Sequence, residues 1–256
     1  MKTGAVRLVQ TCIAEPAAGA RPRMTDCCLC PLQPACPVGA TSGPRRAPST
    51  HACHAVAAGD VVYQTGDAFH QLHALRSGTF KSTVLAPDGR EQVCGFHLAG
   101  DIVGLDGLAD GRHQATVVAL EDTQTCAIDY RTLLSPTSGS PTLQDALHRL
   151  MSREAARGRW HMLQLARMSA LERVAAFLID LSQRASARGN SGRDIHLHMT
   201  RRELGSYLGL TLETVSRSLT SLADLRHLEV DNRHVRIRNL PDFLRVFQAQ
   251  RVWADA

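Results

Sequence analysis

The sequence predicts an α+β protein built, in order, from an antiparallel β domain, one long helix and a winged helix-turn-helix. Three patterns predict this fold. Short β-type runs alternate with glycine-containing turns, apolar residues then recur at helical spacing, and two short capped helices follow. We expect four segments: an amino-terminal cysteine-bearing arm at 1–55, the β domain at 56–137, the long helix at 140–168 and the winged helix-turn-helix at 169–245.

The composition indicates which binding partners and which cellular compartment the protein can have. The net charge of +5 over 256 residues rests almost wholly on arginine, which is compatible with a nucleic-acid partner. No apolar run approaches the ~20 residues of a membrane helix, and Arg7 interrupts what would be the apolar part of a signal peptide. We therefore expect a cytoplasmic protein with no membrane association. Eight cysteines in that reducing compartment indicate metal or redox chemistry rather than disulfides.

The arm is rich in proline, glycine, alanine and serine, so it folds weakly by itself. Cys27, Cys30 and Cys36 stand in it at a C-x2-C-x5-C spacing, which lets two sulfurs of one turn face a metal and a third close round it. A bound metal would supply the order that burial cannot. The arm holds no obvious fourth soft ligand. Cys126, in the last β-type run, is the best candidate, and Cys28 is a rival ligand within the arm.

The β domain is expected to contain short strands at residues 61–63, 72–75, 79–85, 92–96, 116–120 and 125–128. Turns such as Ser77-Gly78 and Asp88-Gly89 separate them about every ten residues, which is typical of an antiparallel barrel, roll or sandwich. Cys94 lies inside one of these strands, so we expect it to be a small buried apolar residue.

The long helix has a favourable start, since Ser140 can cap it and Pro141 suits its first turn. One narrow apolar stripe then runs along about six turns. Such a stripe, with an arginine-rich outer face, favours packing against a second copy of the same helix, as in a coiled-coil dimer. The alternative is that the stripe lies on the β domain. The stripe consists of Leu147, Met151, Ala155, Gly158, Met162 and Leu165.

The carboxyl-terminal segment predicts a helix-turn-helix, preceded by a helix that starts at Ala170. Thr200 and Glu203 form a capping box at the start of one short helix, which ends at Gly209. Thr211 caps the second helix, and residues 228–237 suit a hairpin wing. The buried face of the second helix is expected to hold Val215, Leu219 and Leu222.

The second of these helices carries side chains suited to reading bases. Glu213, Ser216 and Arg217 project from one side of it, at spacings of three and four. Arginine can bond a guanine bidentately in the major groove, glutamate can accept from cytosine, and serine can serve either. Phosphate contacts are expected from residues round them, namely Thr200, Arg201, Thr211, Thr214 and the wing residue Arg233.

These motifs together resemble the CRP/FNR family of bacterial transcription regulators, and within it the oxygen-sensing FNR branch. The resemblance runs from about Val56 to Leu240. It rests on Leu75-Arg76-Ser77-Gly78, on Phe96-His97-Leu98-Ala99-Gly100-Asp101, on the run that starts at Arg173 and on the helix-turn-helix. It implies a cyclic-nucleotide-binding-like β-roll and a homodimer on double-stranded DNA, in which Glu213, Ser216 and Arg217 read a palindromic TTGAT-type site.

The resemblance also implies a switch. It implies one [4Fe-4S] cluster per subunit, held by Cys27, Cys30, Cys36 and Cys126. An intact cluster would promote dimerisation and DNA binding, and oxygen would destroy it and switch the protein off. The turn between Lys81 and Gln92 lies where the family touches RNA polymerase.

A departure from the family pattern argues against cyclic-nucleotide binding. Members that bind the nucleotide pair its phosphate with an arginine that is followed by Ser or Thr. The equivalent stretch here, residues 111–116, reads Gly-Arg-His-Gln-Ala-Thr.

Two other interpretations stay open. Four thiolates suit zinc as well as iron–sulfur, so the protein could be a constitutive DNA-binding protein with a structural zinc. It could also be a relative that senses haem or another ligand. An enzyme is not expected, because no Walker loop, G-x-S-x-G elbow or H-E-x-x-H motif is present. The twelve histidines are scattered, and pairs such as His196 and His198 have no evident metal partners in the sequence.

Overall fold

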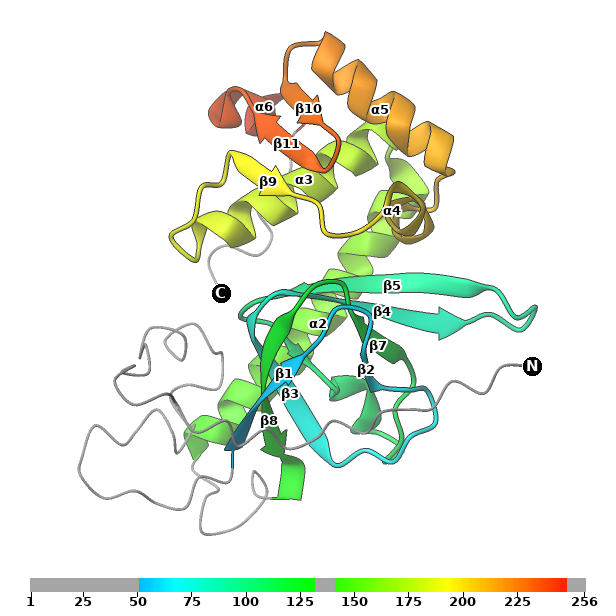
Figure 1. Cartoon of the computed structure of the whole chain (residues 1–256), viewed down its shortest axis with the longest axis vertical. Helices are drawn as coiled ribbons and strands as arrows, with labels where there is room; N and C mark the ends of the chain where they lie inside the picture. Colours follow the sequence, from blue (N-terminus) through cyan, green and yellow to red (C-terminus); the bar gives the residue numbers. More distant parts are fainter. Residues whose placement is uncertain (1–50, 132–140, 248–256) are drawn as a thin grey trace. The chain divides into compact units, whose positions relative to one another are not determined.

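The computed structural model describes residues 51–131 and 141–247 (Figure 1). Their contacts divide them into two compact units, and the division falls between Ala155 and Ala156. The first unit holds the β domain and the start of the long helix α2 (Pro141–Arg167), and the second holds the rest of that helix and the helix-turn-helix. The expected Ser140 cap lies outside the described residues.

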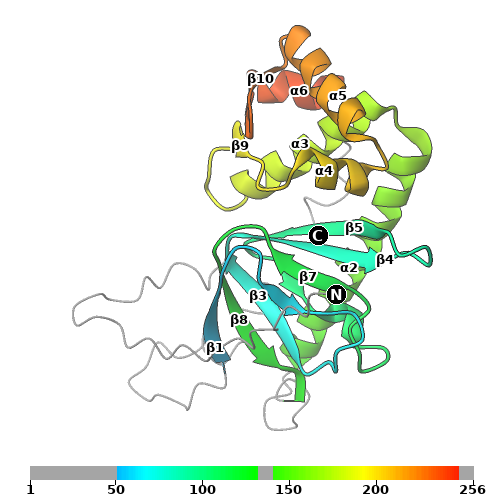
Figure 2. The ribbon, with the colours of Figure 1, turned by 45° about the vertical axis from the view of Figure 1, so that its right-hand side comes forward.

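The β domain is a roll of two four-stranded antiparallel sheets (Figures 1 and 2). One sheet has the order β1-β8-β3-β6 and the other the order β2-β7-β4-β5. A short 3-10 helix, η3 (Leu105–Gly107), follows β6. The strands are β1 (His51–Val56), β2 (Val61–Tyr63), β3 (Gln71–Ser77), β4 (Thr79–Leu85), β5 (Glu91–Leu98), β6 (Ile102–Val103), β7 (Thr116–Ala119) and β8 (Thr123–Asp129).

Both sheets contribute to one apolar cluster inside the roll. Phe80 of β4 is fully buried there, and Leu75 of β3 and Val117 of β7 pack in the same cluster. Side chains alternate between the two faces of a strand, so Leu72 and Ala74 of β3 belong to a different cluster on the other face. The alternation of side chains along β3 therefore separates two apolar layers.

Gly78 makes the tight connection between β3 and β4. Its φ is 88°, a left-handed conformation that residues with a Cβ rarely adopt. A Cβ at this position would lie 2.3 Å from the Oγ1 of Thr123. The turn predicted at Ser77-Gly78 is confirmed, and a larger residue would fit only if Thr123 moved.

The roll differs from the sequence-based expectation at three places. Strand β1 begins at His51, so it includes residues that we expected in the arm. It pairs along its length with β8, and this pairing stabilises a strand in which only Val56 has a high β propensity. Strand β6 has two residues, too few to show any periodicity. Cys94 is exposed rather than buried, because the alternation along β5 turns Val93 inward and Cys94 outward.

The first half of α2 packs on the sheet that contains β8. Leu150 is buried against Leu72 and Ile128, which lie on β3 and β8. Leu147 is half-buried, and it packs against the same cluster. The cluster also contains the buried residues Ala74 and Ile102, and Cys126, Tyr130 and Ala146 pack against it. The start of α2 and the strand that carries Cys126 thus share one apolar core.

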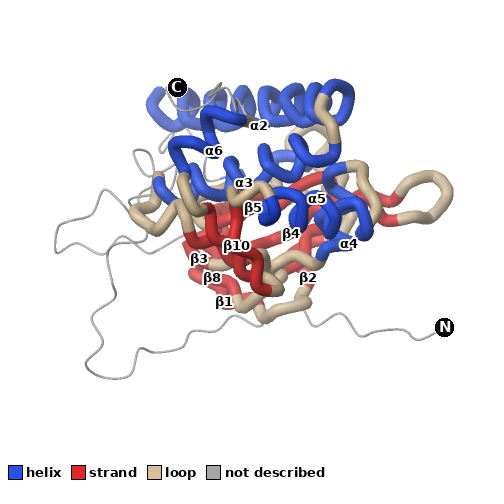
Figure 3. The backbone as a smooth tube through the Cα atoms, turned by 90° about the horizontal axis from the view of Figure 1, so that it is seen from above, coloured by secondary structure: helices blue, strands red, loops and turns tan. Residues whose placement is uncertain are grey.

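The second unit is a winged helix-turn-helix. Its elements after α2 are α3 (Ala170–Ser186), β9 (Asp194–His196), α4 (Arg201–Leu208), α5 (Leu212–Asp224), β10 (Leu228–Asp231), β11 (His234–Ile237) and α6 (Leu240–Val246). The strands form an antiparallel sheet in the order β10-β11-β9. Helices α4 and α5 lie side by side (Figure 3). The predicted buried face of α5 is confirmed, since Val215, Leu219 and Leu222 are each at most 2 % exposed.

His73 should make the stability of the roll depend on pH. Burial, and then the positive charges of His113 and His54, lower its pKa from 6.5 to about 4, and its Nδ1 is buried without a hydrogen-bond partner. Between pH 6.5 and 4 the unfolded chain therefore binds a proton that the folded chain does not. We expect the free energy of unfolding to fall by on the order of 1–3 kcal/mol as the pH drops through this window.

Urea unfolding at pH 7 and at pH 4.5 measures this effect. The variant His73→Gln should lose part of the difference between the two pH values, because its side chain does not titrate. The matched variant at an exposed position, His70→Gln, should keep the wild-type profile. Identical profiles for wild type and His73→Gln would contradict the assignment.

Candidate functional site

The ends of the helices in the helix-turn-helix are determined by local residues, namely helix caps and glycines, that can be recognised in the sequence. The hydroxyl of Thr200 accepts from the backbone N of Glu203 at 3.1 Å, and the Glu203 carboxylate accepts from the backbone N of Thr200 at 2.7 Å, which completes the capping box. Gly209, with φ 64°, ends α4 in the left-handed conformation. The turn is close-packed, since a Cβ on Gly205 would lie 2.7 Å from the carbonyl oxygen of Leu210.

Helix α5 presents the three predicted base-reading residues. Glu213 and Arg217 are exposed and Ser216 is half-buried, while Val215 on the opposite face is fully buried. The pKa of Glu213 is lowered by hydrogen bonds from its own backbone N–H and from Thr211, and then by the charges of Arg217 and Arg202. Glu213 is therefore an ionised acceptor at neutral pH.

Two of the predicted phosphate contacts lie together where the wing meets α4. Arg201, at the start of α4, donates to the carbonyl of Asn232 in the wing turn. Arg233, the next residue of that turn, donates to the carbonyl of His198 at 3.4 Å. Burial, and then the charge of Arg233, lower the pKa of Arg201. Two guanidinium groups thus concentrate positive charge at one place, as phosphate recognition requires.

Two of the three threonines expected to contact phosphates are helix caps, and the third, Thr214, lies in the first turn of α5. Thr200 caps α4, and Thr211 caps α5 by accepting from the backbone N of Thr214 at 3.2 Å. The hydroxyls of Thr211 and Thr214 lie 3.0 Å apart, and Arg217 donates to Thr214 at 3.4 Å. Thr200 and Thr211 thus have a structural role as caps, and a phosphate contact by any of the three threonines stays a prediction.

Arg173 joins the end of α2 to the end of α4. Its guanidinium donates to the carbonyl oxygens of Leu165 at 2.7 Å, Met168 at 3.0 Å and Leu208 at 3.0 Å. Carbonyls at helix ends lack partners within the helix, so a cation there is favourable. In the sequence Arg173 stands out only as part of a motif. Its carbonyl contacts could not be predicted, because every residue has a backbone carbonyl.

Most of the predicted dimer stripe is exposed on α2. Met151 is 46 % exposed, Met162 62 % and Leu165 37 %, and Ala155 and Gly158 are exposed between them. Leu147 differs from these five, because it packs on the roll. An apolar stripe of this length on a helix surface is typical of a protein–protein contact.

Cys126 is the one predicted cluster ligand that the structure describes. It lies on β8, between Cys53 of β1 and Ala74 of β3, and it is half-buried. Cys27, Cys30 and Cys36 lie outside the described residues, as does Cys28. Within residues 51–131 and 141–247, no group of three or more His, Cys, Asp or Glu side chains is arranged to hold a metal ion. A half-buried thiol is a soft donor that fits an iron–sulfur cluster or zinc.

The structure brings together some polar residues that the sequence does not connect. His196, for which the sequence shows no metal partner, lies opposite His234 in the wing sheet, with their Nδ1 atoms 3.4 Å apart. In the roll, Asp106 contacts His113 and Tyr63. These pairs come from separate strands or loops, so no local pattern of residues reveals them.

The fold and the site together define a DNA-binding transcription regulator with a β-roll and a winged helix-turn-helix. Two families match the chain: the Cyclic nucleotide-binding domain over residues 53–135 and the Crp-like helix-turn-helix domain over residues 172–246. The fumarate and nitrate reduction regulatory protein of Escherichia coli K12 is 41 % identical over 181 residues, which are 71 % of this chain and 72 % of that protein. The anaerobic regulatory protein of Aggregatibacter actinomycetemcomitans is 41 % identical over 184 residues, 72 % of each chain.

The chain therefore belongs to the CRP/FNR family, whose members are regulators that work as dimers on DNA and are not enzymes. The structure of FixK2 from Bradyrhizobium japonicum matches with a TM-score of 0.69 at 29 % identity, over 77 % of this chain and 96 % of that one. A CRP-family regulator from Thermus thermophilus, at 18 % identity, shares the fold, with a TM-score of 0.59 over 76 % of this chain and 96 % of that one. No helix among the described residues is long and apolar enough to cross a membrane.

Proposed function

We propose that this protein is a cytoplasmic, oxygen-responsive transcription regulator whose switch is one [4Fe-4S] cluster per subunit, bound by Cys27, Cys30, Cys36 and Cys126. The observation that carries the proposal is the place of Cys126, which packs against the same core cluster as Leu147 of α2. The names of two relatives, an anaerobic regulatory protein and a fumarate and nitrate reduction regulatory protein, support the same function.

The chain's part in the switch is to connect the arm to the long helix. The bound cluster supplies the oxygen-reactive group. Ligation of a cluster through Cys126 would fix the three arm cysteines to β8, and β8 shares its core with the start of α2. Loss of this ligation would free the arm, so the packing round Leu147 would loosen and the dimeric state of α2 would become less populated.

The other end of α2 is attached to the DNA-reading unit. Arg173 binds carbonyls at the ends of α2 and α4, and the ring of His161 on α2 stacks on Tyr207 of α4, with centroids 4.3 Å apart. A dimer formed through Met151, Ala155, Gly158, Met162 and Leu165 would thus set the position of α4 and, with it, of α5. Two recognition helices held in this way match a palindromic site.

Helix α5 is proposed to recognise TTGAT-type half-sites through Glu213, Ser216 and Arg217. Replacing Arg217 by alanine should weaken binding to the specific site by about 1–3 kcal/mol, because a bidentate contact to guanine is lost. Fluorescence anisotropy with the palindrome, and with variants at the contacted guanine, measures this. The control is Arg245→Ala, which removes an exposed arginine that pairs with Asp242 on α6. An unchanged preference at the guanine in Arg217→Ala would reject the role of this residue.

RNA polymerase is the proposed partner of the hairpin between β4 and β5. Its tip, Pro87-Asp88-Gly89-Arg90, is exposed, and Leu85 beside it is 67 % exposed. An exposed leucine of this kind next to a charged turn suits a small protein contact.

Cyclic nucleotides are not proposed as ligands of the roll. Residues 111–116 lack an arginine followed by Ser or Thr. Arg112, which lies nearest to that pattern, donates to the carbonyl of Gly66 at 2.7 Å.

The effect of air on DNA binding tests the proposed function. Protein purified without oxygen should bind a palindromic TTGAT-type duplex, and after exposure to air its affinity should fall by more than about tenfold as the dimer dissociates. The same measurement with protein kept under nitrogen controls for loss of activity over time. Equal affinity before and after air would contradict the oxygen response while leaving the DNA-reading assignment intact.

A further inference from the structure

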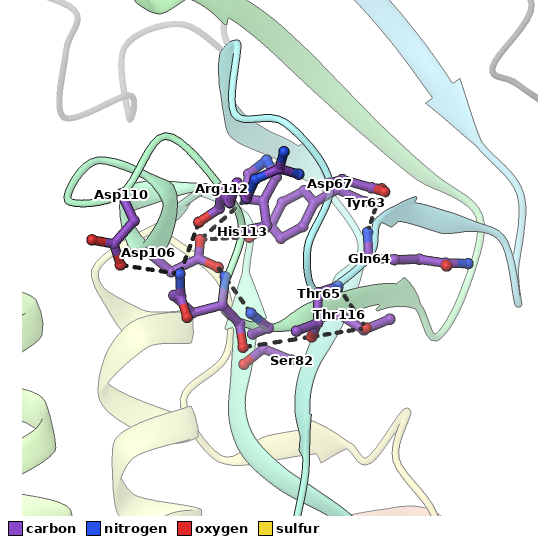
Figure 4. Close-up of polar contacts among 12 residues, drawn as sticks. Tyr63, Gln64, Thr65, Asp67, Ser82, Asp106, Asp110, Arg112, His113 and Thr116 are labelled. Atoms are coloured by element: carbon purple, nitrogen blue, oxygen red, sulfur yellow. Dashed lines mark hydrogen bonds and ion pairs between the residues drawn. The ribbon is translucent and has the colours of Figure 1, made fainter.

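Several hydrogen-bond donors surround one carboxylate of the roll (Figure 4). Asp106, on η3, has its Oδ2 2.9 Å from the backbone N of Gln114 and 3.1 Å from the backbone N of Ala115. Its Oδ1 lies 3.3 Å from the Tyr63 hydroxyl and 3.4 Å from Nδ1 of His113. Four groups that can donate a hydrogen bond therefore converge on one carboxylate.

These donors are held in place independently of Asp106. His113 is 4 % exposed, and its ring stacks on Tyr63 with centroids 3.6 Å apart. Phe69 meets the same imidazole edge-on, at 5.5 Å. Two consecutive backbone N–H groups directed at one point form a concavity that binds anions. Because the rings pack on one another, and Gln114 and Ala115 lead directly into strand β7, the donors would keep their direction if the carboxylate were removed.

The electrostatics of the position favour an anion. Burial of the Asp106 carboxyl acts to raise its pKa, but the hydrogen bonds from His113, Gln114 and Ala115 and the charge of His113 outweigh burial, so the pKa lies below its usual value. The side chain is 25 % exposed. Solvent, and a small solute, can therefore reach the place that the carboxylate occupies.

We propose that Tyr63, His113 and the amides of Gln114 and Ala115 form an anion-binding site, which the chain fills with its own Asp106 carboxylate. The ligand class of the site is a small oxyanion, such as formate or acetate. A carboxylate on a short side chain is present at an effective concentration that a free anion does not reach in solution. The wild-type roll is therefore closed to such ligands. This site lies within the span that matches the Cyclic nucleotide-binding domain family, and it does not depend on the iron–sulfur cluster.

Chemical rescue tests the proposal. The variant Asp106→Ala removes the carboxylate and leaves a space that formate fits, so the full-length variant should be less stable than wild type. Formate should raise its melting temperature in a saturable way, by about 2–4 °C over chloride at equal ionic strength. Wild type should show no such gain. In proton–nitrogen NMR spectra of Asp106→Ala, the amide signals of Gln114 and Ala115 should shift with formate.

Two further variants control the experiment. Asp110→Ala removes an exposed carboxylate of the same loop, which accepts from the Gln114 side chain at 3.3 Å rather than from the backbone, so formate should not stabilise it. Asp106→Asn keeps the size of the side chain and one oxygen but not the charge. It should fold even where the alanine variant does not, with a lower melting temperature than wild type and no response to formate.

Several results would overturn the proposal. They are an Asp106→Ala variant as stable as wild type, a formate effect of equal size in wild type and Asp110→Ala, or an absence of amide shifts at Gln114 and Ala115. Asp106→Asn with wild-type stability would also overturn it. So would saturable stabilisation of the wild-type protein by cyclic AMP, because the site would then be open.

Discussion

Replacing Cys126 by alanine is expected to abolish the cluster, the dimer and specific DNA binding together. The thiol would be the only ligand from the roll, so the three arm cysteines alone would leave the cluster incomplete and unattached to β8. The apolar neighbours of Cys126, among them Leu147 and Tyr130, would pack round alanine with little change, because Cys126 is only half-buried and alanine is also small and apolar. The loss of function should therefore come from ligation and not from folding.

Iron analysis, size-exclusion chromatography and DNA binding under nitrogen measure the three losses. A matched control is Cys94→Ala, which removes an exposed cysteine of β5 in the same roll and should keep cluster, dimer and affinity. Circular dichroism should show that both variants are folded. A Cys126→Ala protein that retains both iron and the dimer would remove Cys126 from the ligand set.

The second large effect is expected at Met162, toward the carboxyl-terminal end of the exposed stripe on α2. Met162→Glu should turn the dimer into a monomer and weaken binding to the palindrome by more than ~100-fold, because burying an unpaired carboxylate in each half of a helix seam costs several kcal/mol. Met162 is 62 % exposed in the single chain, so the substitution should not disturb the fold of either unit.

Sedimentation and DNA titration, both without oxygen, measure the effect of Met162→Glu. The adjacent Leu163→Glu is a close control: the residue is 46 % exposed on the same helix, about 100° round from the predicted stripe. It should remain dimeric. If Leu163→Glu dissociates the dimer and Met162→Glu does not, the seam lies on another face of α2.

The sequence predicted most of the fold, because its signals are local. The Thr200–Glu203 capping box, the left-handed Gly209 and the Thr211 cap each act within one turn of helix, and all three are found where the sequence places them. Strands β2 and β4 have the predicted bounds. In contrast, β1 is a strand because β8 pairs with it, and no property of residues 51–56 indicates that pairing.

Only the parts of the candidate site that depend on residues close together in the sequence could be predicted. The base-reading set on α5 follows from helical spacing, and the structure places Glu213 and Arg217 on its exposed side. The carbonyl contacts of Arg173 and the four donors round Asp106 were not predictable, since backbone groups supply most of them and any residue has those. Exposure of Cys94 was missed because a short strand alone does not tell which of its faces is inside.

The absorption spectrum of protein purified without oxygen, recorded before and during exposure to air and paired with iron and acid-labile sulfide analysis, tests the central claim most directly. The account predicts a broad brown absorption in the violet region that bleaches in air, with iron and sulfide in equal amounts, four of each per chain. A colourless protein that contains zinc, sharp haem bands, or a protein with neither iron nor sulfide would contradict it.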